Sequence, residues 1–97
     1  MKNYQIYVIF DCFEGKREAF VEKVKAEGLV DAIRNEDGCI RYDFYFSEKD
    51  KNQILLIEEW ETKEKQQIHV NQPHMATFRE IKKDYIGNTT LGEFEIK

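Results

Sequence analysis

The chain has 97 residues, of which 41% are hydrophobic and 35% are charged, with five glycines and one proline. This length supports one domain with a single core, and the composition excludes disordered, collagenous and low-complexity proteins. The formal charge of −4, with no more than two basic residues in succession, argues against a nucleic acid as partner.

Neither the ends of the chain nor its apolar runs indicate a membrane or an export signal. No apolar run approaches the ~20 residues that a membrane span requires, so no membrane partner is expected. The apolar segment near Met1 is short and alternates with polar residues, unlike a signal peptide. The expected location is therefore cytoplasmic.

The first half of the chain predicts strand, helix, turn and strand. Residues 4–13 are rich in aromatic and β-branched side chains and predict a first strand. Apolar residues then recur at helical spacing over residues 16–34, with Gly28 marking a kink. The polar run 35–38 predicts a turn, and residues 39–46 predict a second strand. That strand would place four side chains on one face: Ile40, Tyr42, Phe44 and Phe46.

The second half predicts strand, two helices and strand. After a polar hairpin connection, residues 53–61 predict the third strand. Thr62 is expected to cap a short helix, and Pro73 suits the first position of the next one. The pair at 87–88 is expected to end that helix, ahead of a last strand over residues 89–96.

The order β-α-β-β-α-β in about a hundred residues favours a ferredoxin-like α+β sandwich in one domain over residues 1–97. Its antiparallel sheet would be covered by helices on one face. The first strand is nevertheless apolar on both faces, since Ile6 and Val8 alternate with Tyr7 and Ile9. Leaving such a face in water costs ~25 cal/mol per Å². We therefore expect a second copy to pack sheet to sheet, as a homodimer.

Candidate catalytic groups concentrate between residues 58 and 74, which hold the only tryptophan and both histidines. Strand alternation puts Glu58 on an apolar face, where a carboxylate is costly unless it is paired or protonated. We therefore expect Glu58 to hydrogen-bond His69 or His74, one of which would act as a general base. The structural alternative is that these groups only tether the helical segment to the sheet.

Aromatic and polar side chains near this region are candidates for a substrate pocket. Trp60 is either core or a wall that stacks on a flat substrate. Tyr42, Phe44 and Phe78 are candidate lining residues, with Tyr42 able to offer a phenol. Asn71 either caps the helix that starts at Pro73 or binds the substrate.

The spacing of the two histidines does not indicate a metal site. His69 and His74 are five residues apart with a proline between them, unlike the i, i+4 pairs of zinc-binding helices. Glu58 could complete a set of two histidines and one carboxylate in principle. We nevertheless expect no metal and no other cofactor. Arg41 and Arg79 are expected to be solvated, unless one of them holds a substrate anion at a pocket mouth.

Two motifs carry a family resemblance. The Glu-Glu-Trp run at 58–60, followed by His69 and by the Pro-His pair at 73–74, resembles the antibiotic biosynthesis monooxygenase family. This family includes the quinol-monooxygenase-like dimeric α+β barrels. The run at 36–42 resembles its E-x-G-C-x-x-Y turn into the second strand. The resemblance extends over nearly the whole chain, from Tyr4 to about residue 85.

The resemblance implies a sheet-to-sheet homodimer that closes an α+β barrel, with a pocket in each subunit. It implies a cofactor-independent monooxygenase that uses O₂ on a quinol-like or aromatic small molecule. One alternative is the isomerisation or breakdown of a small phosphorylated sugar or ketone, which predicts a basic phosphate clamp. Another is a non-catalytic ligand-binding module. Haem-degrading members have a tryptophan where this chain has His69, and a strand-one asparagine that residues 4–13 lack.

Overall fold

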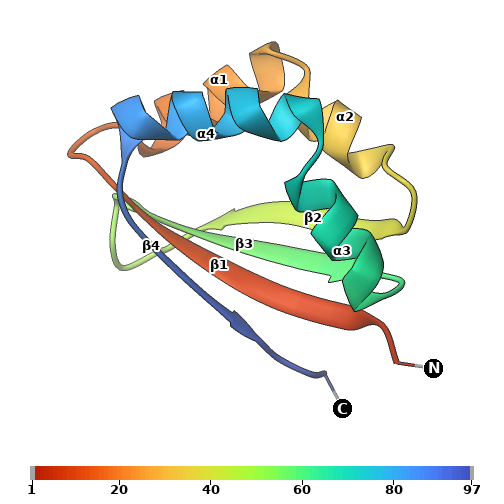
Figure 1. Cartoon of the computed structure of the whole chain (residues 1–97). Helices are drawn as coiled ribbons and strands as arrows, with labels where there is room; N and C mark the ends of the chain where they lie inside the picture. The colour runs from red at the N-terminus through yellow and green to blue at the C-terminus, as the bar shows by residue number, and fades with distance from the viewer. Residues whose placement is uncertain (1, 97) are drawn as a thin grey trace.

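A computed structural model, which describes residues 2–96, places four strands in one antiparallel sheet (Figure 1). The strands are β1 (Tyr4–Cys12), β2 (Cys39–Phe46), β3 (Gln53–Trp60) and β4 (Ile86–Glu93). Their order in the sheet is β2-β3-β1-β4, and each neighbouring pair is antiparallel. This is the predicted ferredoxin-like α+β arrangement, in which β1 and β3 form the centre of the sheet.

Four helices lie on one side of the sheet (Figure 1). They are α1 (Arg17–Ala26), α2 (Leu29–Arg34), α3 (Lys63–Val70) and α4 (Pro73–Tyr85). The predicted kink at Gly28 is a complete break between α1 and α2, because Gly28 adopts a φ of 74°. Glycine reaches this left-handed conformation without the steric penalty that a Cβ imposes. None of the described helices has the length and apolar character needed to cross a membrane.

The helical connection that carries the histidines begins and ends as local chemistry dictates. Thr62 caps α3, since its hydroxyl accepts a hydrogen bond from the Lys65 N–H at 3.1 Å. Pro73 occupies the first turn of α4, where its missing N–H costs nothing. The prediction that residues 87 and 88 end this helix is wrong. They belong to β4, because β1 pairs with the chain directly after Tyr85.

The face of the sheet beneath the helices forms the core, as strand alternation predicts. Ile54, Leu56 and Trp60 of β3 are buried there. Two side chains predicted for this face in β2 are not buried. Ile40 is 49% exposed because it is the extra residue of a β-bulge between Cys39 and Arg41, and Phe46 is 44% exposed at the sheet edge.

The opposite face of the sheet is also apolar. Tyr7 and Ile9 of β1 and Leu55 and Ile57 of β3 alternate with the core residues and are only partly buried. No described helix covers this face (Figure 1). The apolar surface that motivates the expected dimer is therefore present in the folded chain.

Candidate functional site

A cavity of about 200 Å³ lies between the core face of the sheet and helices α3 and α4. A cavity of ~150 Å³ is enough for benzene, so this one can hold a single aromatic ring. Most of its wall is apolar, and polar side chains form the rest. The apolar residues are Ile6, Val8, Phe10, Leu56, Val70, Met75, Phe78 and Leu91; the polar ones are Tyr42, Glu58, Gln66, His69, Arg79, Lys82 and Thr89.

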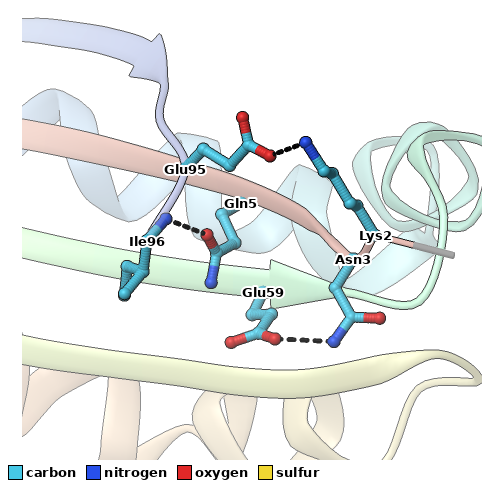
Figure 2. A pocket seen from close by; sticks show the side chains of 6 residues that line it. All are labelled: Lys2, Asn3, Gln5, Glu59, Glu95 and Ile96. Atoms are coloured by element: carbon cyan, nitrogen blue, oxygen red, sulfur yellow. Dashed lines mark hydrogen bonds and ion pairs between the residues drawn. The ribbon is translucent and has the colours of Figure 1, made fainter.

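A larger hollow of about 390 Å³ lies near the two chain ends (Figure 2). Its polar groups are already paired with one another: Asn3 donates a hydrogen bond to Glu59, Lys2 pairs with Glu95, and Gln5 accepts from the Ile96 N–H. It holds no histidine, and its groups satisfy each other. The smaller cavity beneath the helices is therefore the candidate site.

His69 of α3 is the imidazole that reaches this cavity. Its side chain is almost fully buried, and its ring centroid lies 4.6 Å from that of Trp60. Nδ1 lies 2.9 Å from Oε2 of Glu36, in the turn after α2. When Glu36 is ionised, Nδ1 donates this hydrogen bond, which leaves Nε2 of the neutral ring as a proton acceptor.

His74, at the start of α4, binds the same carboxylate oxygen. Its Nε2 lies 2.7 Å from Oε2 of Glu36, so one buried carboxylate accepts from two imidazoles. His74 is not among the residues that line the cavity. His74 is therefore a partner of Glu36 that does not contact the candidate site.

The predicted hydrogen bond between Glu58 and a histidine is wrong. Oε1 of Glu58 accepts from the indole N–H of Trp60 at 3.0 Å and lies 3.9 Å from Nε2 of His69, beyond hydrogen-bond reach. The carboxylate that is hydrogen-bonded to both imidazoles is Glu36. The local sequence pattern indicates only a turn at this residue. The E-x-G-C-x-x-Y resemblance contained this residue and was the only signal for it.

Glu58 and His69 form an acid–base pair suited to neutral pH. Burial raises the pKa of Glu58 to about 7, and the charge of Glu36 adds to the rise, against the hydrogen bond from Trp60. Burial also lowers the pKa of His69, although its hydrogen bond to Glu36 opposes the change. At neutral pH a neutral imidazole therefore faces a carboxyl group that is partly protonated.

The raised pKa of Glu58 predicts a pH dependence of stability. The folded protein holds this proton more tightly than the unfolded chain does. The stabilisation that this bound proton gives the folded protein is therefore complete below pH 4.5 and is lost as the pH rises through about 7. We expect this group to lower the free energy of unfolding by about 3 kcal/mol across that window. Urea unfolding at a series of pH values measures the slope, which Glu58→Gln should flatten; an unchanged slope in that variant would refute the assignment.

Of the predicted substrate-binding residues, Tyr42 and Phe78 line the cavity and three do not. Trp60 is fully buried behind the cavity, where it holds Glu58 and stacks on His69. Phe44 is partly buried and packs against the core, with its ring centroid 5.8 Å from that of Tyr42. Asn71 is exposed and donates to the Gln67 carbonyl, so it closes α3 and does not cap the helix at Pro73.

Glu36, His69 and His74 are the described residues best placed to hold a metal ion. Each offers one ligand atom, and these atoms lie within 4.8 Å of one another. The carboxylate thus comes from Glu36, where the sequence suggested Glu58. The distances of 2.9 and 2.7 Å are hydrogen-bond lengths, whereas ligands of one zinc ion stand ~3.3 Å apart. The arrangement is that of two imidazole N–H groups that donate hydrogen bonds to one carboxylate oxygen.

Comparison with known proteins gives a family and a close relative in sequence. The sequence model of the family described as "Antibiotic biosynthesis monooxygenase" matches residues 6–81. An uncharacterized protein of Synechocystis sp. (strain ATCC 27184 / PCC 6803 / Kazusa), sll1783, is 30% identical over 71 residues. The match covers 73% of this chain and 47% of that protein, so the chain spans about half the length of this relative.

Solved structures share the fold at low sequence identity. PA3566 from Pseudomonas aeruginosa has a TM-score of 0.86 at 22% identity, with 100% of this chain and 96% of that chain covered. A candidate antibiotic biosynthesis monooxygenase from Nitrosomonas europaea has a TM-score of 0.84 at 22% identity, covering 95% and 88%. A Bacteroides thetaiotaomicron protein of unknown function, described as a possible oxidoreductase, has a TM-score of 0.78 at 25% identity, covering 95% and 97%.

Proposed function

The chain belongs to the antibiotic biosynthesis monooxygenase family, and we propose that it is a cofactor-independent monooxygenase acting on a quinol-like or aromatic small molecule. The observation that carries this proposal is the pair of Glu58 and His69 at the end of an apolar cavity. A neutral imidazole with a free Nε2 is the group required to take a proton from a phenol or an enol.

The proposed reaction begins when Nε2 of His69 removes the hydroxyl proton of the substrate. The resulting electron-rich anion gives one electron to O₂, and the two radicals combine to form a C–O bond. The peroxide takes the proton back from His69. The O–O bond of this hydroperoxide then breaks, and its outer hydroxyl leaves as water with the hydrogen of the same carbon, which yields a carbonyl. One oxygen atom thus enters the substrate and the other leaves as water.

The protein contributes to this reaction through proton placement and a dry cavity. Glu36 holds Nδ1 of His69 and stabilises the imidazolium that forms after proton transfer. Glu58, when protonated, can donate a hydrogen bond to the developing substrate anion. The apolar wall limits the water around a bound ring, which strengthens both effects.

Oxygen consumption with a panel of single-ring quinols tests the proposal. We expect consumption that depends on the protein, persists with a chelator present, and places one atom of ¹⁸O₂ in the product. Ligand-induced stabilisation without oxygen uptake would instead identify a non-catalytic binding module and refute the oxygenase.

Isomerisation of a phosphorylated sugar or ketone is a second candidate for the same site. It is favoured by one observation, since an acid and a base 3.9 Å apart could move a proton between neighbouring carbons. The two basic residues that line the cavity, Arg79 and Lys82, would suit a phosphate. Exchange of a substrate hydrogen with D₂O in the absence of oxygen would favour this reaction over oxygenation.

We also propose that the protein is a homodimer, packed through the uncovered apolar face of the sheet. Support comes from the partly buried Tyr7, Ile9, Leu55 and Ile57 on a face without helices. Sedimentation equilibrium should give twice the chain mass, and Ile57→Lys should give the monomer. A monomeric wild-type protein at micromolar concentration would contradict this proposal.

A further inference from the structure

We propose that the cavity holds an anionic group of its ligand at the end opposite His69, bound by the ammonium group of Lys82 with Arg79 beside it. The ligand is thus an aromatic molecule that carries a hydroxyl at one end and a carboxylate or phosphate at the other. This inference rests on the proposed function only in taking the cavity as the substrate site, because it concerns binding and not reaction.

Lys82 is a half-buried cation that the described residues leave without an anionic partner. Its Nζ lies 5.2 Å from the ring centroid of Phe10, inside the wall of the cavity. Within residues 2–96, no carboxylate forms an ion pair with it. A partly desolvated charge is costly unless it is paired, so its position requires an explanation. Burial lowers the pKa of Lys82, and the nearby charge of Arg79 adds to the decrease.

The next residue in the helix shows the contrast. Lys83 is exposed, and its ammonium lies 2.9 Å from a carboxylate oxygen of Glu80. Two adjacent lysines therefore have different surroundings, one in solvent with an acidic partner and one beside an apolar cavity without one. Solubility accounts for the exposed Lys83 but not for the half-buried Lys82.

Arg79 adds positive charge between Lys82 and the end of α3. It lies three residues before Lys82 on α4, so both side chains project from the same side of the helix. One of its terminal nitrogens donates to the Val70 carbonyl at 3.1 Å, which fixes the guanidinium near the cavity. Two cations thus lie together on a protein whose formal charge is −4.

The basic end is also open to solvent. A surface groove of about 370 Å³ is lined by three basic residues of α4 and by the first four residues of β4, through Thr89; the basic residues are Arg79, Lys82 and Lys83. Arg79, Lys82 and Thr89 join this groove to the cavity. An anion could therefore remain partly hydrated in the groove while the ring that carries it enters the cavity.

The two polar ends are separated along β1. Ile6, which pairs with Glu58, marks the acid–base end, and Phe10, beneath Lys82, marks the basic end. Four residues of strand separate their Cα atoms by about 13 Å. Because Lys82 is long and reaches inward, a molecule of one ring with a short acidic arm can contact both ends.

The test is a binding comparison between an acid and its neutral analogue. The probes are 4-hydroxyphenylacetate, its amide and phenyl phosphate, with titration followed by the fluorescence of Trp60 behind the cavity. We expect the acid to bind about tenfold more tightly than the amide, the effect of one charge-assisted hydrogen bond. A tighter Kd for phenyl phosphate or for the acid identifies phosphate or carboxylate as the preferred anion.

Matched lysine variants locate the effect. Lys82→Met should remove the preference for the acid and leave amide binding unchanged, whereas Lys82→Arg should retain it. Lys25→Met removes the same charge at an exposed position of α1 that lines neither the cavity nor the groove, and should change nothing. Melting curves establish that each variant is folded.

Three results would overturn the inference: equal affinity of wild-type protein for acid and amide, equal losses in the two methionine variants, or no saturable binding of any anion at millimolar concentration. Failure of the oxygenase proposal gives a different pattern. In that case Lys82-dependent anion binding persists while no oxygen is consumed.

Discussion

Replacing His69 with glutamine is expected to lower the rate of oxygen consumption by about 10²–10⁴-fold, the usual contribution of a general base. Glutamine can still donate a hydrogen bond to Glu36, so the buried carboxylate keeps a partner. It cannot accept a proton at neutral pH, so formation of the substrate anion fails. The measurement is kcat for oxygen uptake, with a melting curve to show that the variant is folded.

His74→Gln is the matched control for this prediction. It makes the same change in the other imidazole that binds Glu36, at a residue that does not line the cavity. We expect kcat to fall by less than about tenfold, since only the support of Glu36 weakens. Equal losses in the two variants would mean that His69 is not the base, and that the cluster acts as a structural unit.

Glu36→Leu is expected to cause the largest loss of stability of any substitution in the cluster. Its carboxylate side chain is 8% exposed and accepts hydrogen bonds from two imidazoles, which the change would leave unpaired. Leaving a buried hydrogen-bonding group without its partner costs ~1–3 kcal/mol, and the loss for two imidazoles in a domain of this size lowers Tm by about 10 °C or more. Urea and thermal unfolding measure the loss.

Glu36→Gln separates the charge of this group from its hydrogen bonds. An amide oxygen still accepts from an imidazole, so the loss of stability should be clearly smaller than in the leucine variant. The lost charge should also lower the pKa values of both His69 and Glu58, because Glu36 raises each of them. Leucine and glutamine variants of equal stability would show that the hydrogen bonds contribute nothing.

Much of the fold could be predicted from the sequence because its signals are local. The alternation in β1 and β3 identifies the buried face, and Thr62 and Pro73 mark the starts of two helices. The incorrect predictions concern positions where the pairing of β-strands decides the structure. A bulge turns Ile40 out of the core, and pairing with β1 continues β4 back to Ile86, through residues that resemble a turn.

The candidate site could be predicted in kind but not in detail. A buried carboxylate paired with an imidazole was expected from the cost of burying Glu58, and such a pair exists with Glu36 in its place. The partners of Glu36 lie 33 and 38 residues away, and the choice between two acids depends on where a turn meets a helix. No periodic pattern contains that information.

The long separation between Glu36 and its imidazoles also bears on how the protein becomes active during synthesis. The carboxylate belongs to the first half of the chain and both rings belong to the second. A nascent chain that has emerged only as far as β3 therefore carries no assembled reaction centre. The cluster should form together with the docking of α3 and α4, so that partly made or truncated copies lack the candidate site.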